Sequence, residues 1–207
     1  MIYRPGQVYV KQGTEHVVYD HSFPSYAKGV VVPHCLYDEA HNTGYVTLGT
    51  SKDTSEFACA SIAYWWEREI VWLYPWADTL ILRCDGGGSN SWRSGLMKQD
   101  FQELATRIGF PLQIQHYPPY CSKYNRIEHR LFPHITRQWD GVIFEDYEMI
   151  RTLTEQTTTK TGLTVHAAIH DRPYQTGRKA DAETVENLSI DYHKTLGKWN
   201  YTLYPKK

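Results

Sequence analysis

An apolar run that ends in an acid and is followed at once by glycines constrains this chain more than any other feature. Residues 79–84 (TLILRC) are mostly apolar and lead to Asp85, after which come Gly86, Gly87 and Gly88. Continuous apolar runs of this length are typical of strands buried on both faces of an α/β sheet. Such sheets place functional side chains where their strands end, so we expect Asp85 at a carboxyl edge. A solvated turn that begins with an aspartate is the structural alternative.

The rest of the chain alternates between strand and helix patterns. Strands are predicted at 29–39 and 43–51, joined by a hairpin turn at 41–44, and further strands at 112–117, 164–170 and 198–205. Helices are predicted at 53–69, over a segment that ends at Gly109, at 123–139, at 147–157 and at 181–188. Pro133 should kink or shorten the helix in which it falls. This order predicts an α/β fold with a mixed sheet.

Length and charge limit the function classes. A chain of 207 residues, 41% of them apolar, suits one compact domain with a substantial core. Its 22 basic and 23 acidic residues give a net charge of -1, whereas proteins that grip DNA over a broad face are usually basic. Either nucleic acid is not the partner, or the main DNA-binding module is absent, or the positive charge is local.

The cysteines and the apolar segments of the chain indicate the cellular compartment in which the protein works. The 4 cysteines are dispersed, and the first residues contain no apolar core of a signal peptide. No apolar run approaches the length of a membrane span. We therefore expect reduced thiols in a cytoplasmic protein that does not bind membranes.

Glu128 is the second candidate acid. It follows the Pro118–Pro119 pair and lies three positions after Asn125. That spacing is a capping box, in which Glu128 only closes the first turn of a helix. The same position also suits a metal ligand that faces the strand edge carrying Asp85. Both interpretations stay open on the residues alone.

Positive charge gathers around Glu128. Lys123, Arg126 and Arg130 fall within one segment of an otherwise balanced chain. They are either a solvated helix face or a local patch that contacts phosphates, which net charge would conceal.

Two acids at an open sheet edge suit Mg²⁺ or Mn²⁺, which prefer oxygen ligands. Phosphodiester cleavage with two such ions needs carboxylates that hold both of them. A zinc site is a further alternative, but its candidate residues have no common zinc spacing. These candidates are His16, His21, His34, Cys35 and His41.

The two acidic motifs together resemble a known family. The pairing of CDGGGSN (84–90) with PPYCSKYNRIEHRLF (118–132) resembles bacterial insertion-sequence transposases of the DDE type, distant relatives of the mariner group. Further similar segments are Asn42–Gly44, Asp53–Ala58, Thr157–Leu163 and Trp199–Tyr201. The resemblance implies an RNase H-like mixed sheet flanked by helices, with Asp85 as the second catalytic acid and Glu128 as the third.

The first catalytic acid of that family belongs to a strand that should precede residue 1. We therefore expect residues 1–207 to form a single catalytic domain that is incomplete at its N-terminus, without its first strand and without the upstream helix-turn-helix region. Asp20, at the end of the apolar run Val17–Tyr19, is a substitute by position. Asp38 has a similar but lesser claim.

The resemblance implies a transposase core that cleaves DNA strands at insertion-sequence ends and transfers them, with two Mg²⁺ or Mn²⁺ ions. Its partners would be transposon-end and target DNA and further copies of itself. Two alternatives remain: an inactive remnant that keeps DNA-binding or self-association surfaces, and a structure-specific nuclease on the same fold. The DNA sequence upstream of Met1 would distinguish an enzyme from a remnant.

Overall fold

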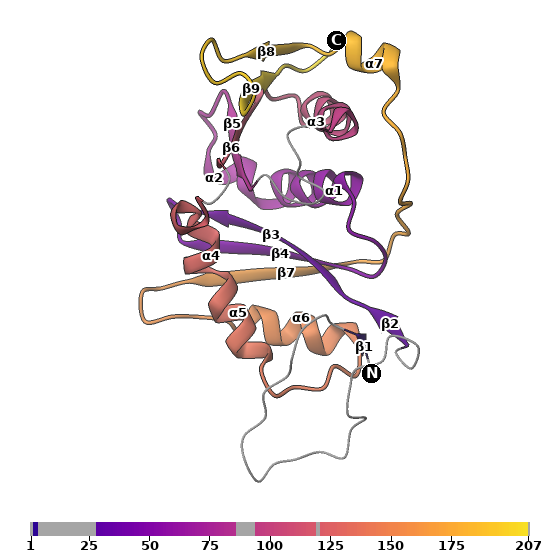
Figure 1. Ribbon diagram of the computed structural model, residues 1–207. Coiled ribbons are helices and arrows are strands. Elements are labelled where there is room, and N and C mark those ends of the chain that lie inside the picture. The colour runs from indigo at the N-terminus through magenta and orange to yellow at the C-terminus, as the bar shows by residue number, and fades with distance from the viewer. Residues whose placement is uncertain (1, 4–27, 86–93, 119–120, 207) are drawn as a thin grey trace. The chain divides into compact units, whose positions relative to one another are not determined.

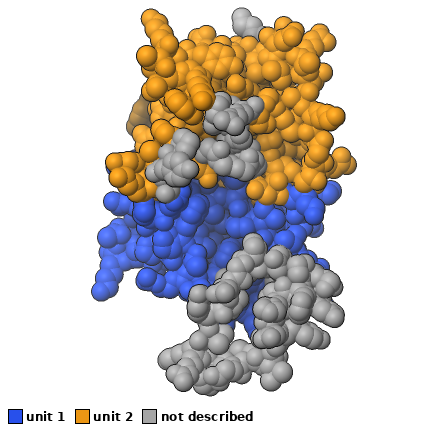
Figure 2. Space-filling view, viewed as in Figure 1, with its two compact units in different colours: residues 1–52, 126–173 blue, residues 53–125, 174–207 orange. Residues whose placement is uncertain are grey.

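Contacts within the chain group it into two compact units. The computed structural model describes residues 2–3, 28–85, 94–118 and 121–206. Unit 1 is formed by residues 1–52 and 126–173, and unit 2 by residues 53–125 and 174–207 (Figure 2). The prediction that residues 1–207 form a single domain stays a prediction.

Four strands begin the chain, and helices and strands are interspersed after them (Figure 1). The strands are β1 (Ile2–Tyr3), β2 (Gly29–Val30), β3 (Val32–Asp38), β4 (Thr43–Gly49), β5 (Leu80–Cys84), β6 (Leu112–His116), β7 (Thr164–His170), β8 (Ile190–Tyr192) and β9 (Asn200–Leu203). The helices are α1 (Ser55–Trp65), the π-helical η2 (Trp66–Ile70), α2 (Val71–Leu73), α3 (Gly95–Ile108), the 3-10 turn η4 (Ser122–Tyr124), α4 (Arg126–Arg130), α5 (Phe132–Trp139), α6 (Tyr147–Glu155) and α7 (Ala182–Glu186). The expected α/β class is confirmed, since two mixed sheets are flanked by helices in a way consistent with an RNase H-like fold.

The larger sheet of unit 1 has the order β3-β4-β7, and β1 pairs with β2 in a separate parallel sheet of two strands. β3 and β4 form the predicted antiparallel hairpin, and β4 runs parallel to β7. At the hairpin turn Asn42 has a φ of 52°, a left-handed conformation that asparagine tolerates better than most residues. β4 has a strand on each side, and all of its residues are buried, so both faces of this central strand are covered.

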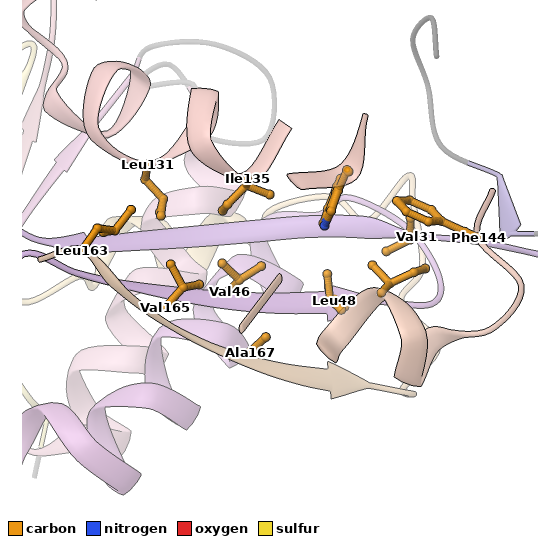
Figure 3. Close-up of a cluster of buried hydrophobic side chains, with 11 residues drawn as sticks. Val31, Val46, Leu48, Leu131, Ile135, Phe144, Leu163, Val165 and Ala167 are labelled. Carbon is orange, nitrogen blue, oxygen red and sulfur yellow. The ribbon is translucent and has the colours of Figure 1, made fainter. Parts of the chain in front are cut away.

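The core of unit 1 lies between this sheet and α5 and α6 (Figure 3). It consists of Val31, Val46, Leu48, Leu131, Ile135, Trp139, Phe144, Ile150, Leu163, Val165 and Ala167. The alternating residues of β4 and β7 supply one face, and the inward positions of the two helices supply the other. Because Leu131 follows α4 directly, this core also anchors the helix that carries Glu128.

Pro133 shortens that helix, as predicted. The segment expected as one helix at 123–139 is divided into α4 and α5, with Leu131 between them at φ -123° and ψ -59°. Pro133 lies in the first turn of α5, where a missing backbone N–H is tolerated. Glu128 therefore belongs to a helix of only 5 residues.

The sheet of unit 2 has the order β5-β6-β9-β8. β5 and β6 are parallel, and β9 is antiparallel to its two neighbours. The sequence patterns had not indicated β8. α1 begins at its N-cap Thr54 and packs against α3, which ends at Gly109 in the left-handed conformation (φ 71°).

One prediction for unit 2 was wrong. The apolar run before Asp85 was expected to be buried on both faces, but Ile81 is 49% exposed. The reason is that packing covers only one face of β5, so its side chains alternate between a half-buried and an exposed face; among the described residues β5 is also the end strand of its sheet. An apolar run indicates that a segment favours a strand. Whether each face of that strand is buried depends on tertiary packing.

A buried ion pair joins α1, α3 and the segment before α7 within unit 2. Asp100 of α3 is 2% exposed and accepts hydrogen bonds from the Ser55 hydroxyl and from Arg178 Nη2, the latter at 3.0 Å. Arg178 Nη1 also donates to Glu56 Oε2 at 3.4 Å. A buried carboxylate needs such partners, so this network fixes the segment around Arg178 on the two helices.

Candidate active site

Asp85 follows directly on β5, at the carboxyl end of the parallel pair β5–β6. The backbone N–H of Tyr117 donates to the carbonyl of Cys84 at 2.9 Å, which continues the pairing to the ends of both strands. The side chain of Asp85 is exposed. An exposed carboxylate at the carboxyl end of parallel strands can reach a cation or a substrate.

His116, the last residue of β6, lies beside Asp85, and the sequence analysis did not identify it as a candidate. Its Nδ1 lies 3.4 Å from the backbone oxygen of Asp85, and its Nε2 lies 3.4 Å from the hydroxyl of Tyr201 on β9. His116 is 4% exposed, and burial lowers its pKa, against the opposing effect of Asp85. The alternation of Leu112, Ile114 and His116 on one buried face was the signal that could have found it.

Glu128 lies on the first turn of α4 in unit 1, and its side chain is half-buried. Asn125, just before the helix, is 8% exposed, in keeping with a residue that belongs to the helix start. Since Asp85 belongs to unit 2 and Glu128 to unit 1, the meeting of the two carboxylates stays a prediction.

The three basic candidates are exposed. Arg126 Nε lies 3.1 Å from Glu39 Oε2 in a surface ion pair. The Nζ of Lys123 lies 4.9 Å from the centre of the Tyr124 ring. Arg130 ends α4 with an exposed side chain. All three can therefore reach a phosphate, although Arg126 would first have to share or leave Glu39.

The candidates nearer the N-terminus have a different outcome. Asp20 lies outside the described residues, as do His16 and His21. Asp38 accepts from the backbone N–H of Ala40 at 2.9 Å and lies 2.9 Å from His41 Nδ1. These contacts indicate that Asp38 stabilises the hairpin turn.

Residues of the zinc alternative lie on β3 in unit 1. His34 and Cys35 are adjacent, so their side chains point to opposite faces of the sheet. Burial lowers the pKa of His34 to about 4, with His170 as a smaller cause, and burial raises the pKa of Cys35 to about 12. In the described parts of the chain, no group of three His, Cys, Asp or Glu side chains could hold a metal ion. The 4 cysteines are free thiols.

Comparison with known proteins gives the family. The family model described as the Rhodopirellula transposase DDE domain matches residues 2–205. The chain belongs to this family. The resemblance to insertion-sequence transposases is thereby confirmed over nearly the whole chain. The function of the chain lies in transposition, with DNA as the substrate. No curated protein and no solved structure matches this transposase domain. No helix among its described residues is long and apolar enough to span a membrane.

Proposed function

We propose that this transposase domain cleaves DNA strands at the ends of its insertion sequence and joins the freed 3′-hydroxyls to target DNA. The observation that carries the proposal is an exposed carboxylate, Asp85, at the carboxyl end of parallel strands in a chain of the DDE family. A DDE domain takes its name from acids that act together, and Glu128 is the partner acid that we propose for Asp85.

The donor set fits divalent cations with oxygen ligands. Asp85 and Glu128 would hold two Mg²⁺ or Mn²⁺ ions, which prefer carboxylate and water ligands. Bound ions of this kind supply an activated nucleophile and stabilise the charge that develops on the leaving oxygen. Asp20 remains a proposed third ligand, and an acid supplied by a preceding strand is the alternative to it.

Lys123, Arg126 and Arg130 would position the DNA by contacts with its phosphates. Such contacts fix register and orientation without reading sequence. We further propose that the protein works as a homo-oligomer, so that two element ends can be held together.

Strand cleavage in the presence of Mn²⁺ tests the catalytic assignment. The substrate is a labelled duplex carrying an end of the element, and the variants Asp85→Asn and Glu128→Gln each remove one charge without changing side-chain volume. We expect each to lower the cleavage rate at least about 100-fold, because each loses a ligand to ions that stabilise the transition state. The matched controls Asp78→Asn and Glu145→Gln alter exposed acids of unit 2 and unit 1 and should cleave like the wild type.

The results separate the alternatives. Equal cleavage by the wild type and both site variants would end the assignment of Asp85 and Glu128. If the wild type and all variants bind the DNA but none of them cuts it, the result would support the inactive remnant. Cleavage of branched DNA without transfer to a target would support the structure-specific nuclease.

A further inference from the structure

Two segments that the fold and the catalytic site leave unexplained meet in unit 1. The hairpin turn at Asn42 and the loop Thr157–Leu163 are far apart in sequence. Asn42 Nδ2 donates to the carbonyl of Thr161 at 3.1 Å, and the carbonyl of Asn42 accepts from the N–H of Thr164 at 3.3 Å. The hydroxyls of Thr43 and Thr164 lie 3.1 Å apart. The loop is therefore held against the hairpin by both backbone and side-chain bonds.

The loop is also ordered by its own hydrogen bonds. Thr158 Oγ1 donates to the carbonyl of Leu163 at 3.0 Å, and Thr159 Oγ1 accepts from the N–H of Leu163 at 3.2 Å. The N–H of Gly162 donates to the carbonyl of Thr159 at 3.0 Å, and Gly162 has a φ of +82° that favours glycine. This turn presents Lys160 at its exposed tip. The lysine is thus displayed from a preorganised loop.

The charges around the hairpin leave this end of unit 1 suited to an anion. Glu39 lies 3.1 Å from the guanidinium of Arg126, and Asp38 lies 2.9 Å from the ring nitrogen Nδ1 of His41, so both nearby carboxylates already have partners within unit 1. No carboxylate in the described parts of the chain forms an ion pair with Lys160. Figure 1 draws the loop between α6 and β7, the end of the β3–β4 hairpin and α4 on the left-hand side of unit 1.

We propose that the loop Thr157–Leu163, braced by Asn42, contacts the phosphate backbone of double-stranded DNA. Lys160 supplies the charge, and the hydroxyls of Thr159 and Thr161, 2.9 Å apart, supply further hydrogen bonds. Contacts from lysine and threonine to phosphates are independent of sequence. The inference rests on the proposed function, since it takes DNA to be the substrate.

The composition of this surface favours DNA over a protein partner. Protein interfaces have an apolar, often aromatic, centre. The exposed side chains on this loop and turn are instead those of Glu39, Ala40, His41, Thr158, Lys160 and Thr161, and none is a large apolar group.

The salt dependence of DNA binding tests the inference. Anisotropy of a fluorescent 30-base-pair duplex is titrated at several NaCl concentrations, in EDTA so that ions at the catalytic acids do not contribute. For Lys160→Ala we expect Kd to rise about 3- to 10-fold at low salt, and the slope of log K against log salt to fall in magnitude by about 1. Lys52→Ala, an exposed lysine beyond the opposite end of β4, is the matched control and should bind like the wild type.

A second variant separates position from charge. Asn42→Gly keeps a residue that accepts positive φ but removes the brace to Thr161. It should weaken binding and leave the salt slope at the wild-type value, because no charge is lost.

The outcomes distinguish this inference from the proposed function. If Lys160→Ala keeps the wild-type slope of log K against log salt, the inference is overturned. It is also overturned if poly-glutamate competes with the duplex as effectively as unlabelled DNA of equal charge. If the salt slopes in EDTA are as expected but the wild type does not cleave DNA in the separate assay with Mn²⁺, the result supports the inference and counts against the proposed activity. A wild-type protein that does not bind DNA overturns both.

Discussion

At the scale of single residues, the contact between Gly44 and Leu131 sets how closely the chain before α5 approaches the sheet of unit 1. A Cβ on Gly44 would lie 2.5 Å from Leu131 Cδ1, and Leu131 is fully buried. We expect Gly44→Ala to lower the free energy of unfolding by about 1–3 kcal/mol, because an overpacked core must shift. Urea unfolding followed by fluorescence measures it.

A matched glycine provides the control for this substitution. A Cβ on Gly95 would meet Ala180 Cβ at 3.4 Å, an ordinary contact, and Gly95 begins α3. Gly95→Ala should leave stability unchanged or raise it slightly. Equal destabilisation by both substitutions would show that the Leu131 contact is not the cause.

His34 gives a prediction about pH. Its pKa is lowered from 6.5 to about 4 by burial and, less strongly, by His170. Because the unfolded chain binds this proton near pH 6.5 and the folded chain only near pH 4, stability is complete above 6.5 and declines as the pH falls through that window. Between pH 7 and pH 5 the loss should be about 2 kcal/mol.

The variant His34→Asn should remove most of this pH dependence, and the exposed His129→Asn should keep it. Denaturant midpoints at the two pH values measure the difference. If His34→Asn and the wild type lose the same stability, another group is responsible.

At the scale of elements, helix starts are set by local side chains. Asp146 Oδ1 accepts from the N–H of Met149 at 2.8 Å and caps α6, which packs on β7. We expect Asp146→Ala to reduce stability by about 1 kcal/mol, since an unpaired N–H remains at the helix start. Glu145→Ala removes the adjacent exposed acid and should cost less. Thermal unfolding of the two variants makes the comparison, and equal losses would indicate a charge effect instead of a cap.

The same local signals explain why most elements could be predicted. The hairpin at Asn42, the N-cap Thr54, the αL end of α3 at Gly109 and the break near Pro133 depend on residues close in sequence. β8 escaped prediction because its 3 residues are defined mainly by their pairing with β9. Short strands take their stability from a partner strand, which no pattern within the short strand itself reveals.

At the scale of the whole molecule, the strand orders predict a pattern of hydrogen exchange. β4 and β6 each have a strand on both sides, whereas in the described residues β3 and β5 have a neighbouring strand on one side only. Amides of β4 and β6 should therefore exchange most slowly, and alternate amides of β3 and β5 much faster. Exchange resolved to single residues measures this. Uniform protection along β3 or β5 would show that a further strand, from a longer chain or from a second copy, covers that edge.

The sequence by itself determined the α/β class, the positions of most helices and strands, and the family, because these depend on local periodicity, capping residues and short motifs around Asp85 and Glu128. Tertiary structure alone decided that one face of β5 is exposed, that His116 lies against the backbone of Asp85, and that Asn42 holds the loop of Lys160. The physical reason is that burial and hydrogen bonding between distant segments depend on which strands become neighbours, and no local pattern encodes that choice.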